Sequence, residues 1–183
     1  EAILKVHTRD IPLSRDVTLE AMAGATIGFS GADLENLANE AALSAARNGR
    51  DKVTQRDFEL ALDRIILGSE RPPLTNETER RTVAIHEAGH ALVSILTPGA
   101  DPIHKMTIVP RGRALGVTQS MPSDDRRNYT KEYLMGRLVM LMGGRSAEEV
   151  LIGQITSGAE NDLRVVTRLA RDMVAQLGMN EEL

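Results

Sequence analysis

The chain has 183 residues, 42% of them hydrophobic, which is enough for one large domain or two small ones. Its 22 basic and 26 acidic residues give a formal net charge of −4, so no basic surface argues for a nucleic-acid partner. It has no cysteine, so any metal must be held by His, Asp or Glu. No apolar run reaches the roughly 18 residues that cross a bilayer. We expect a soluble fragment that begins inside a helical pattern and stops just after a helix end.

The first section, to about residue 67, has the pattern of a small helical bundle. Short helices are expected at residues 1–7 and 18–23. Ser30 is a good N-cap for a longer helix that ends near Asn48, and Thr54 caps another with Asp57 in its first turn. The apolar positions expected in the core are Leu34, Leu37, Ala41 and Ala45 in the first of these helices and Phe58, Leu62, Ile65 and Ile66 in the second.

An extended linker is predicted at residues 68–74, where Pro72 and Pro73 cannot continue a helix. We therefore divide the chain into domains 1–70 and 71–183. Asn76 starts a new helix that Pro98-Gly99 ends. Strands are expected at 105–109 and 115–119, around a turn at 110–113. The fold class is mainly α, with a small sheet or hairpin.

Three more helices are predicted in the last third of the chain. Thr130 caps the first, which carries Leu134, Leu138 and Leu141 and is expected to break at Gly143-Gly144. Capping-box spacing then marks two further starts, the last helix running to Gly178. These two pairs are Ser146 with Glu149, and Ser157 with Glu160.

The sequence His86-Glu87-Ala88-Gly89-His90 carries the main functional signal. Histidines four apart on a helix project from one face and can hold one ion, while Glu87 beside them can take the proton of a zinc-bound water. About 0.007 such matches are expected by chance in this composition. The alternative is a surface helix that happens to contain these residues. The spacing favours a zinc peptidase.

A helical wheel of this segment separates two faces. His90 falls about 40° from His86, from the 100° step. Ile85, Ala88, Leu92 and Ile95 lie roughly opposite. This arrangement predicts that the helix packs through its apolar side and offers its histidine side.

A third metal ligand is needed, and the residues alone leave it open. The sequence does not match the longer metzincin motif H-E-x-x-H-x-x-G-x-x-H, because Val93 and Leu96 occupy the positions of its Gly and its third His. The candidates are His104, Glu148, Glu149, Glu160 and Asp162. An acid in a first helical turn more often stabilises the helix end than binds metal.

Several motifs resemble the FtsH-type membrane-bound ATP-dependent zinc metalloproteases of the AAA+ class. The resemblance spans nearly the whole chain and rests on segments 28–34 (GFSGADL), 39–42 (NEAA), 86–90 (HEAGH) and 156–163 (TSGAENDL). It implies that Asp162 is the third ligand of a zinc ion and that Glu87 is the catalytic base. Residues 71–183 would then be the zinc metallopeptidase domain, incomplete at its C-terminus.

The same resemblance implies that residues 1–70 are the helical lid of an AAA+ ATPase. His7, Gly31 and Ala32 occupy positions that contact nucleotide in related lids, although an exposed helical histidine and a turn glycine are common without that role. Ile27 departs from the proline usual there. The phosphate-loop motif G-x-x-x-x-G-K-[ST] is absent from the chain, so ATP and magnesium belong to the parent protein and we expect no ATP hydrolysis here.

For the parent, the resemblance implies a homo-hexamer that degrades unfolded and membrane proteins. It would be anchored in the bacterial inner membrane on the cytoplasmic side, or in an organelle membrane if eukaryotic. The strand at 115–119 could take a peptide substrate along its edge, or could be internal to a hairpin. The rival functions are an AAA+ ring-assembly module with a vestigial metal site, and a structural zinc domain with a fourth protein ligand.

Overall fold

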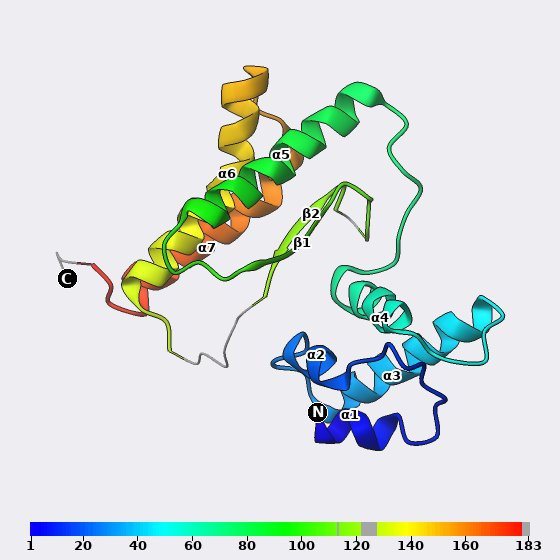
Figure 1. Ribbon diagram of the computed structural model, residues 1–183. Coiled ribbons are helices and arrows are strands. Elements are labelled where there is room, and N and C mark those ends of the chain that lie inside the picture. Colours follow the sequence, from blue (N-terminus) through cyan, green and yellow to red (C-terminus); the bar gives the residue numbers. More distant parts are fainter. Residues whose placement is uncertain (113, 122–127, 181–183) are drawn as a thin grey trace. The chain divides into compact units, whose positions relative to one another are not determined.

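The structure, a computed structural model, describes residues 1–112, 114–121 and 128–180. It consists of two compact units, Glu1–Glu70 and Arg71–Leu183 (Figure 1). Both are built mainly of helices, and the second adds a two-stranded sheet. The mainly α fold class is confirmed. No helix in the described ranges is both long and apolar enough to cross a membrane.

The first unit is a four-helix bundle of α1 (Ala2–His7), α2 (Leu19–Gly24), α3 (Gly31–Arg47) and α4 (Gln55–Leu67). Ser30 caps α3, because its hydroxyl accepts from the Asp33 N–H and the Asp33 carboxylate accepts in return. Thr54 precedes α4 as predicted. Most of the predicted core is buried, but Ile65 is only half-buried and Ile66 is 36% exposed; the buried members include Leu4, Leu34, Leu37, Ala41, Ala45, Phe58 and Leu62.

The second unit packs α5 (Glu77–Leu96) and α7 (Glu160–Ala175) against α6 (Lys131–Ile152), with a short 3-10 turn, Ser157–Ala159, before α7 (Figure 1). Strands β1 (Ile103–Thr107) and β2 (Val117–Ser120) form an antiparallel pair over α5. Both are displaced by about two residues from the predicted strands, and Met106 pairs with Thr118. In the turn Arg111 pairs with Ala114, whereas Arg113 lies outside the described residues.

The predicted break at Gly143-Gly144 is wrong, because α6 continues through both glycines. Each glycine within a helix costs about 1 kcal/mol relative to alanine, so local propensity favoured an end there. The pair is explained by close packing instead. A Cβ on Gly143 would lie 2.8 Å from the carbonyl oxygen of Gly89 and 3.1 Å from Val93 Cγ2. The two helix backbones therefore approach as closely as glycine alone permits.

Two further predictions for this region fail. Ser146 lies inside α6 and starts no helix, since the backbone hydrogen bonds of α6 continue past it. The last helix begins at Glu160, following the 3-10 turn that Thr156 caps, and ends at Ala175 rather than at Gly178. A capping box in the sequence marks only a possible start, and packing against α5 keeps α6 helical across Ser146.

The two faces of α5 are the reverse of the prediction. His86, Glu87 and Gly89 are buried on the packed side, against α6 and β2. Leu92 and Ile95, on the apolar side, are 59% and 73% exposed. The helix therefore packs through its polar face, and in the described part of the chain its apolar face contacts solvent.

Candidate metal centre

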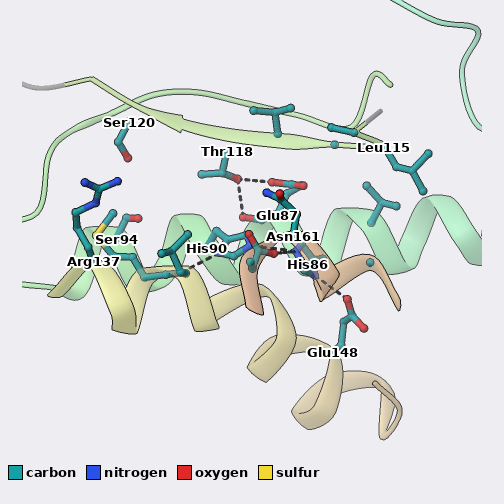
Figure 2. A pocket seen from close by; sticks show the side chains of 18 of the residues that line it. His86, Glu87, His90, Ser94, Leu115, Thr118, Ser120, Arg137, Glu148 and Asn161 are labelled. Atoms are coloured by element: carbon teal, nitrogen blue, oxygen red, sulfur yellow. Dashed lines mark hydrogen bonds and ion pairs between the residues drawn. The ribbon is translucent and has the colours of Figure 1, made fainter. Parts of the chain in front are cut away.

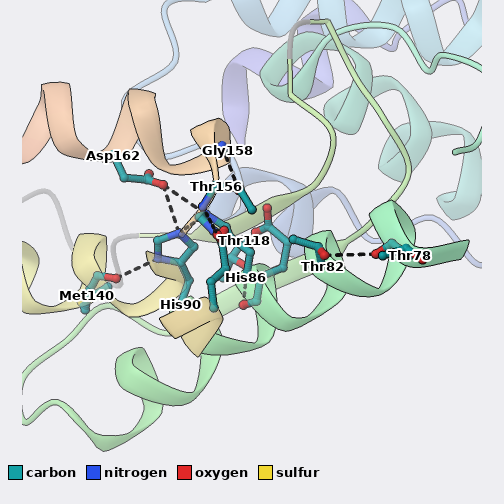
Figure 3. Close-up of polar contacts among 11 residues, drawn as sticks. Thr78, Thr82, His86, His90, Thr118, Met140, Thr156, Gly158 and Asp162 are labelled. Carbon is teal, nitrogen blue, oxygen red and sulfur yellow. Dashed lines mark hydrogen bonds and ion pairs between the residues drawn. The ribbon is translucent and has the colours of Figure 1, made fainter. Parts of the chain in front are cut away.

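Three potential metal ligands converge where α5 meets the start of α7. Two of them, His86 and His90, lie one turn apart on α5, and the third, Asp162, lies in the first turn of α7. The two Nε2 atoms are 3.0 Å apart, and Asp162 Oδ2 lies 3.2 Å from that of His86 and 3.4 Å from that of His90. Figure 3 shows the carboxylate turned toward both rings. These residues form one cluster able to hold a metal ion.

The other ring nitrogens of the two histidines are already engaged. His86 Nδ1 donates to Glu148 Oε1 at 2.6 Å, and His90 Nδ1 donates to the Met140 carbonyl oxygen at 2.8 Å. A carboxylate and a carbonyl only accept, so in the neutral rings the proton is on Nδ1. Both Nε2 atoms then carry lone pairs directed at one point. Histidines that bind a metal commonly donate a hydrogen bond from their other ring nitrogen, as both rings do here.

The electrostatics also favour a cation. Burial opposes the ionisation of Asp162, but its contacts with the two imidazoles outweigh burial and lower its pKa to about 2. Burial likewise acts to lower the pKa of His86 and of His90, and the nearby Asp162 carboxylate raises both pKa values above their ordinary range. An anionic carboxylate beside two lone pairs therefore attracts positive charge, either protons or a metal.

The spacing of the donors fits a small tetrahedral ion. With bonds of about 2.0–2.1 Å, two ligands of a tetrahedral zinc site lie about 3.3 Å apart. The observed separations are 3.0, 3.2 and 3.4 Å. Two nitrogens and one oxygen leave the fourth position to water or substrate, the arrangement of catalytic rather than structural zinc sites.

The Glu87 carboxylate lies against Thr118 of β2 (Figure 2). Thr118 Oγ1 lies 2.7 Å from Glu87 Oε2 and 3.0 Å from the Glu87 carbonyl oxygen, so the threonine hydroxyl can donate to either. Burial raises the pKa of the Glu87 carboxyl, although the hydrogen bond from Thr118 opposes that change. A carboxylate with a raised pKa is a stronger base toward a neighbouring water.

The remaining candidate ligands lie elsewhere. His104 is exposed on β1, Glu160 is exposed at the start of α7, and Glu149 forms an exposed ion pair with Arg145. Glu148 is 1% exposed and bonds to His86 Nδ1 rather than pointing into the cluster.

Sequence reasoning missed two contacts of this cluster and its neighbouring acid. It considered Glu148 only as a ligand, whereas this carboxylate accepts from His86 and from the Thr156 N–H at 2.8 Å. Thr118 was not singled out at all. No local pattern connects either residue with α5, because both contacts bring together separate elements.

A cleft of about 1420 Å³ runs past the cluster. It is lined by α5, β2, α6 and the start of α7 (Figure 2). The predicted nucleotide-contacting residues are not part of it: His7 ends α1 and is half-buried, and Gly31 and Ala32 are exposed at the start of α3. The lining residues of the cleft all belong to the second unit.

Comparison with known families identifies both units. The model of peptidase family M41 matches residues 73–183, and that of the AAA+ lid domain matches residues 16–60. The chain belongs to peptidase family M41. This confirms the resemblance drawn from the motifs.

Proteins named ATP-dependent zinc metalloprotease FtsH are among the relatives that this chain resembles. The one from Thermobaculum terrenum is 56% identical over 180 residues, which are 98% of this chain and 28% of the relative. Those from Syntrophotalea carbinolica and Thermotoga maritima are each 54% identical, over 99% of this chain and 28% and 30% of their own lengths. The chain thus spans less than a third of these M41 relatives.

Proposed function

We propose that the M41 unit is the zinc-binding part of a metalloendopeptidase, with His86, His90 and Asp162 as ligands and Glu87 as general base. The observation that carries this proposal is the convergence of two Nε2 lone pairs and one carboxylate oxygen, with both Nδ1 atoms already donating elsewhere. The names of the FtsH relatives favour zinc among the ions that this donor set accepts.

Zinc, when bound, would polarise the scissile carbonyl and lower the pKa of a water to about 7. Glu87 would take a proton from the attacking water and pass it to the leaving amine. Thr118 fixes the Glu87 carboxylate through its 2.7 Å contact. Glu148 and the Met140 carbonyl hold the two imidazoles in the tautomer that presents Nε2.

The substrate would be an extended polypeptide lying along β2. The cleft is lined by Leu115, Gly116, Val117 and Thr118, and within the described ranges β2 pairs with β1 alone. Hydrogen bonds from the free edge to a peptide main chain are independent of its side chains, so sequence tolerance would be broad. This suits an enzyme that degrades unfolded proteins.

The whole protein would be an ATP-dependent protease. Residues 1–70 would be the lid of its AAA+ module, which the family match over residues 16–60 supports. In it His7, Gly31 and Ala32 would contact nucleotide, with the phosphates and magnesium held by parts outside this chain. We further infer a homo-hexamer, anchored to a membrane on its cytoplasmic side, that degrades unfolded and membrane proteins. The relatives' printed name, FtsH, supports this through the family resemblance.

The rival structural or vestigial site is less consistent with the geometry. A structural zinc site takes four protein ligands. The cluster in the described part of the chain has three, and a buried acid with a raised pKa lies beside it. Such an acid has a role in hydrolysis and none in holding a structural ion.

The test combines zinc content with hydrolysis of casein, a protein without a stable fold. Wild type should bind one zinc ion and cleave casein. Glu87→Gln should keep its zinc but lose about 10³-fold in rate, since the amide cannot accept a proton. Glu149→Gln, an exposed change outside the cleft, is the matched control and should keep both. A wild-type chain without zinc, or a fully active Glu87→Gln variant, contradicts the proposal.

A further inference from the structure

We propose that Gly144 is a positioning residue of this centre, because its missing side chain keeps open the space in which the two histidines meet a metal ion. The inference rests on the proposed zinc function. The sequence suggested that this glycine ends a helix, but it lies in the middle of α6.

Gly144 faces the two imidazoles directly. A Cβ added there would lie 2.5 Å from His86 Nε2, 2.6 Å from His86 Cε1 and 2.6 Å from His90 Nε2. Non-bonded carbon atoms in proteins prefer separations of about 3.5–4.0 Å. A methyl group would therefore overlap the two donor atoms that must reach the ion.

The rings cannot withdraw from such a methyl group without breaking other bonds. His86 is fixed by its Nδ1 contact with Glu148, and that carboxylate is itself 1% exposed and held by the Thr156 N–H. His90 is fixed by the Met140 carbonyl, one turn before Gly144 on the same helix. The substitution would force either the rings or the α5–α6 packing to move.

Gly116 of the cleft offers a contrasting case. A Cβ there would lie 2.8 Å from Glu87 Oε1, 2.8 Å from Glu87 Cγ and 2.8 Å from Val83 Cγ1. It would crowd the proposed base and not the ligands. The two glycines thus clear space for different parts of the site, which makes their effects separable.

The experiment compares three Gly→Ala variants of the 183-residue chain by competition with a zinc chelator. Gly144→Ala should weaken zinc binding about 100-fold, the upper range for loss of a ligand-orienting contact. Gly136→Ala, on the same helix but near only Thr97 Cγ2 at 3.1 Å, should bind like wild type. Gly116→Ala should keep zinc and lose casein hydrolysis. The visible spectrum of bound Co²⁺ should change only in Gly144→Ala.

A second measurement covers the case in which Gly144→Ala does not fold well. Unfolding is followed in chelator, in the native background and in the His86→Ala/His90→Ala background. With both rings present, alanine at 144 should lower the unfolding midpoint. With both rings removed it should raise the midpoint, since alanine favours the helix.

The outcomes separate the two proposals. A wild-type chain that binds no zinc overturns the proposed function and this assignment with it. Wild-type zinc affinity in Gly144→Ala overturns the assignment alone. So does an equal loss of stability in both backgrounds, because that would mean the methyl group clashes with the helix backbones and not with the rings.

Discussion

Two aspartates with lowered pKa values, one in each unit, show how the same side chain can serve a closed network or an open site. Asp57 in the first unit and Asp162 in the second each have a pKa lowered to about 2, although burial acts to raise both. The side chain of Asp57 is fully buried, and that of Asp162 is 18% exposed at the cleft. What differs is the chemistry of their partners.

Around Asp57 every partner is a donor. Arg50 donates two hydrogen bonds, the Ser44 hydroxyl one, and Thr54 two, from its N–H and its hydroxyl. The guanidinium is permanently charged, so the network needs nothing further. Asp57 therefore acts as a structural cap at the start of α4.

Around Asp162 the partners are the Nε2 atoms of two imidazoles, which carry no proton in the neutral rings because the Nδ1 atoms donate elsewhere. Three electron-pair donors then face one another, and only an added cation satisfies all three. A low pKa therefore identifies neither aspartate as functional; the missing donors around Asp162 do so.

The largest expected effect is that of removing the Asp162 carboxylate. Asp162→Ala should weaken zinc binding by more than the about 100-fold that loss of a ligand-orienting partner costs. His104→Ala, an exposed change on β1, is the control and should bind zinc normally. Equilibrium dialysis with metal analysis decides between them. Zinc loss in the His104 variant alone would mean that the ligand set is wrong.

The next largest effect is that of removing the negative charge of Glu148, which accepts a hydrogen bond from His86 Nδ1. Glu148→Gln should weaken zinc binding about 10-fold or more, since the neutral amide still accepts from Nδ1 but no longer makes the ligand more basic. Glu149→Gln, one residue along the same helix and exposed, should have no effect. Equal affinity in both variants would show that the 2.6 Å contact does not affect the metal.

A change to the hydrogen-bond network around Asp57 should alter the stability of the chain and leave zinc binding unchanged. Asp57→Asn should destabilise the folded chain by about 2 kcal/mol at neutral pH, from a pKa shift of nearly two units at 1.36 kcal/mol per unit. Because the folded pKa is lowered, this contribution is present above the unfolded value of 3.8 and is lost as the pH falls toward about 2. The free energies of unfolding of wild type and Asp57→Asn, measured in urea, should therefore become equal in acid. A constant difference would mean that packing, not charge, stabilises this site.

These contrasts mark what the sequence could and could not supply. Helix caps are local, so Ser30, Thr54 and Asn76 were identified at the starts of their helices. The spacing of His86 and His90 is also local, and it correctly placed both on one face of α5. Asp162 came only from the family resemblance, because the five acidic and histidine candidates were equivalent by pattern.

The failures around the metal cluster involve contacts between elements. Gly143-Gly144 looked like a helix end because propensity depends on the segment alone, whereas the close approach of α5 explains the glycines. The apolar face of α5 looked like the packed face, but the buried polar cluster is on the other side. Hydrogen bonds such as Glu148 to His86 join residues 62 positions apart, beyond the reach of any periodic pattern.

The smallest expected effect concerns nucleotide, and it tests whether the first unit holds an open site of its own. The strongest contacts in nucleotide sites of this class come from a phosphate loop, its lysine and magnesium. This chain has no such loop, and the charged network around Asp57 is satisfied internally. His7, Gly31 and Ala32 could contact base and ribose, which without charge neutralisation leaves ATP binding at about millimolar, or about −4 kcal/mol. Isothermal titration should therefore detect no binding at micromolar ATP, and casein hydrolysis should not respond to ATP. Micromolar affinity would mean that the first unit contains a nucleotide site of its own. The contrast between Asp57 and Asp162 would then no longer separate a structural unit from a functional one.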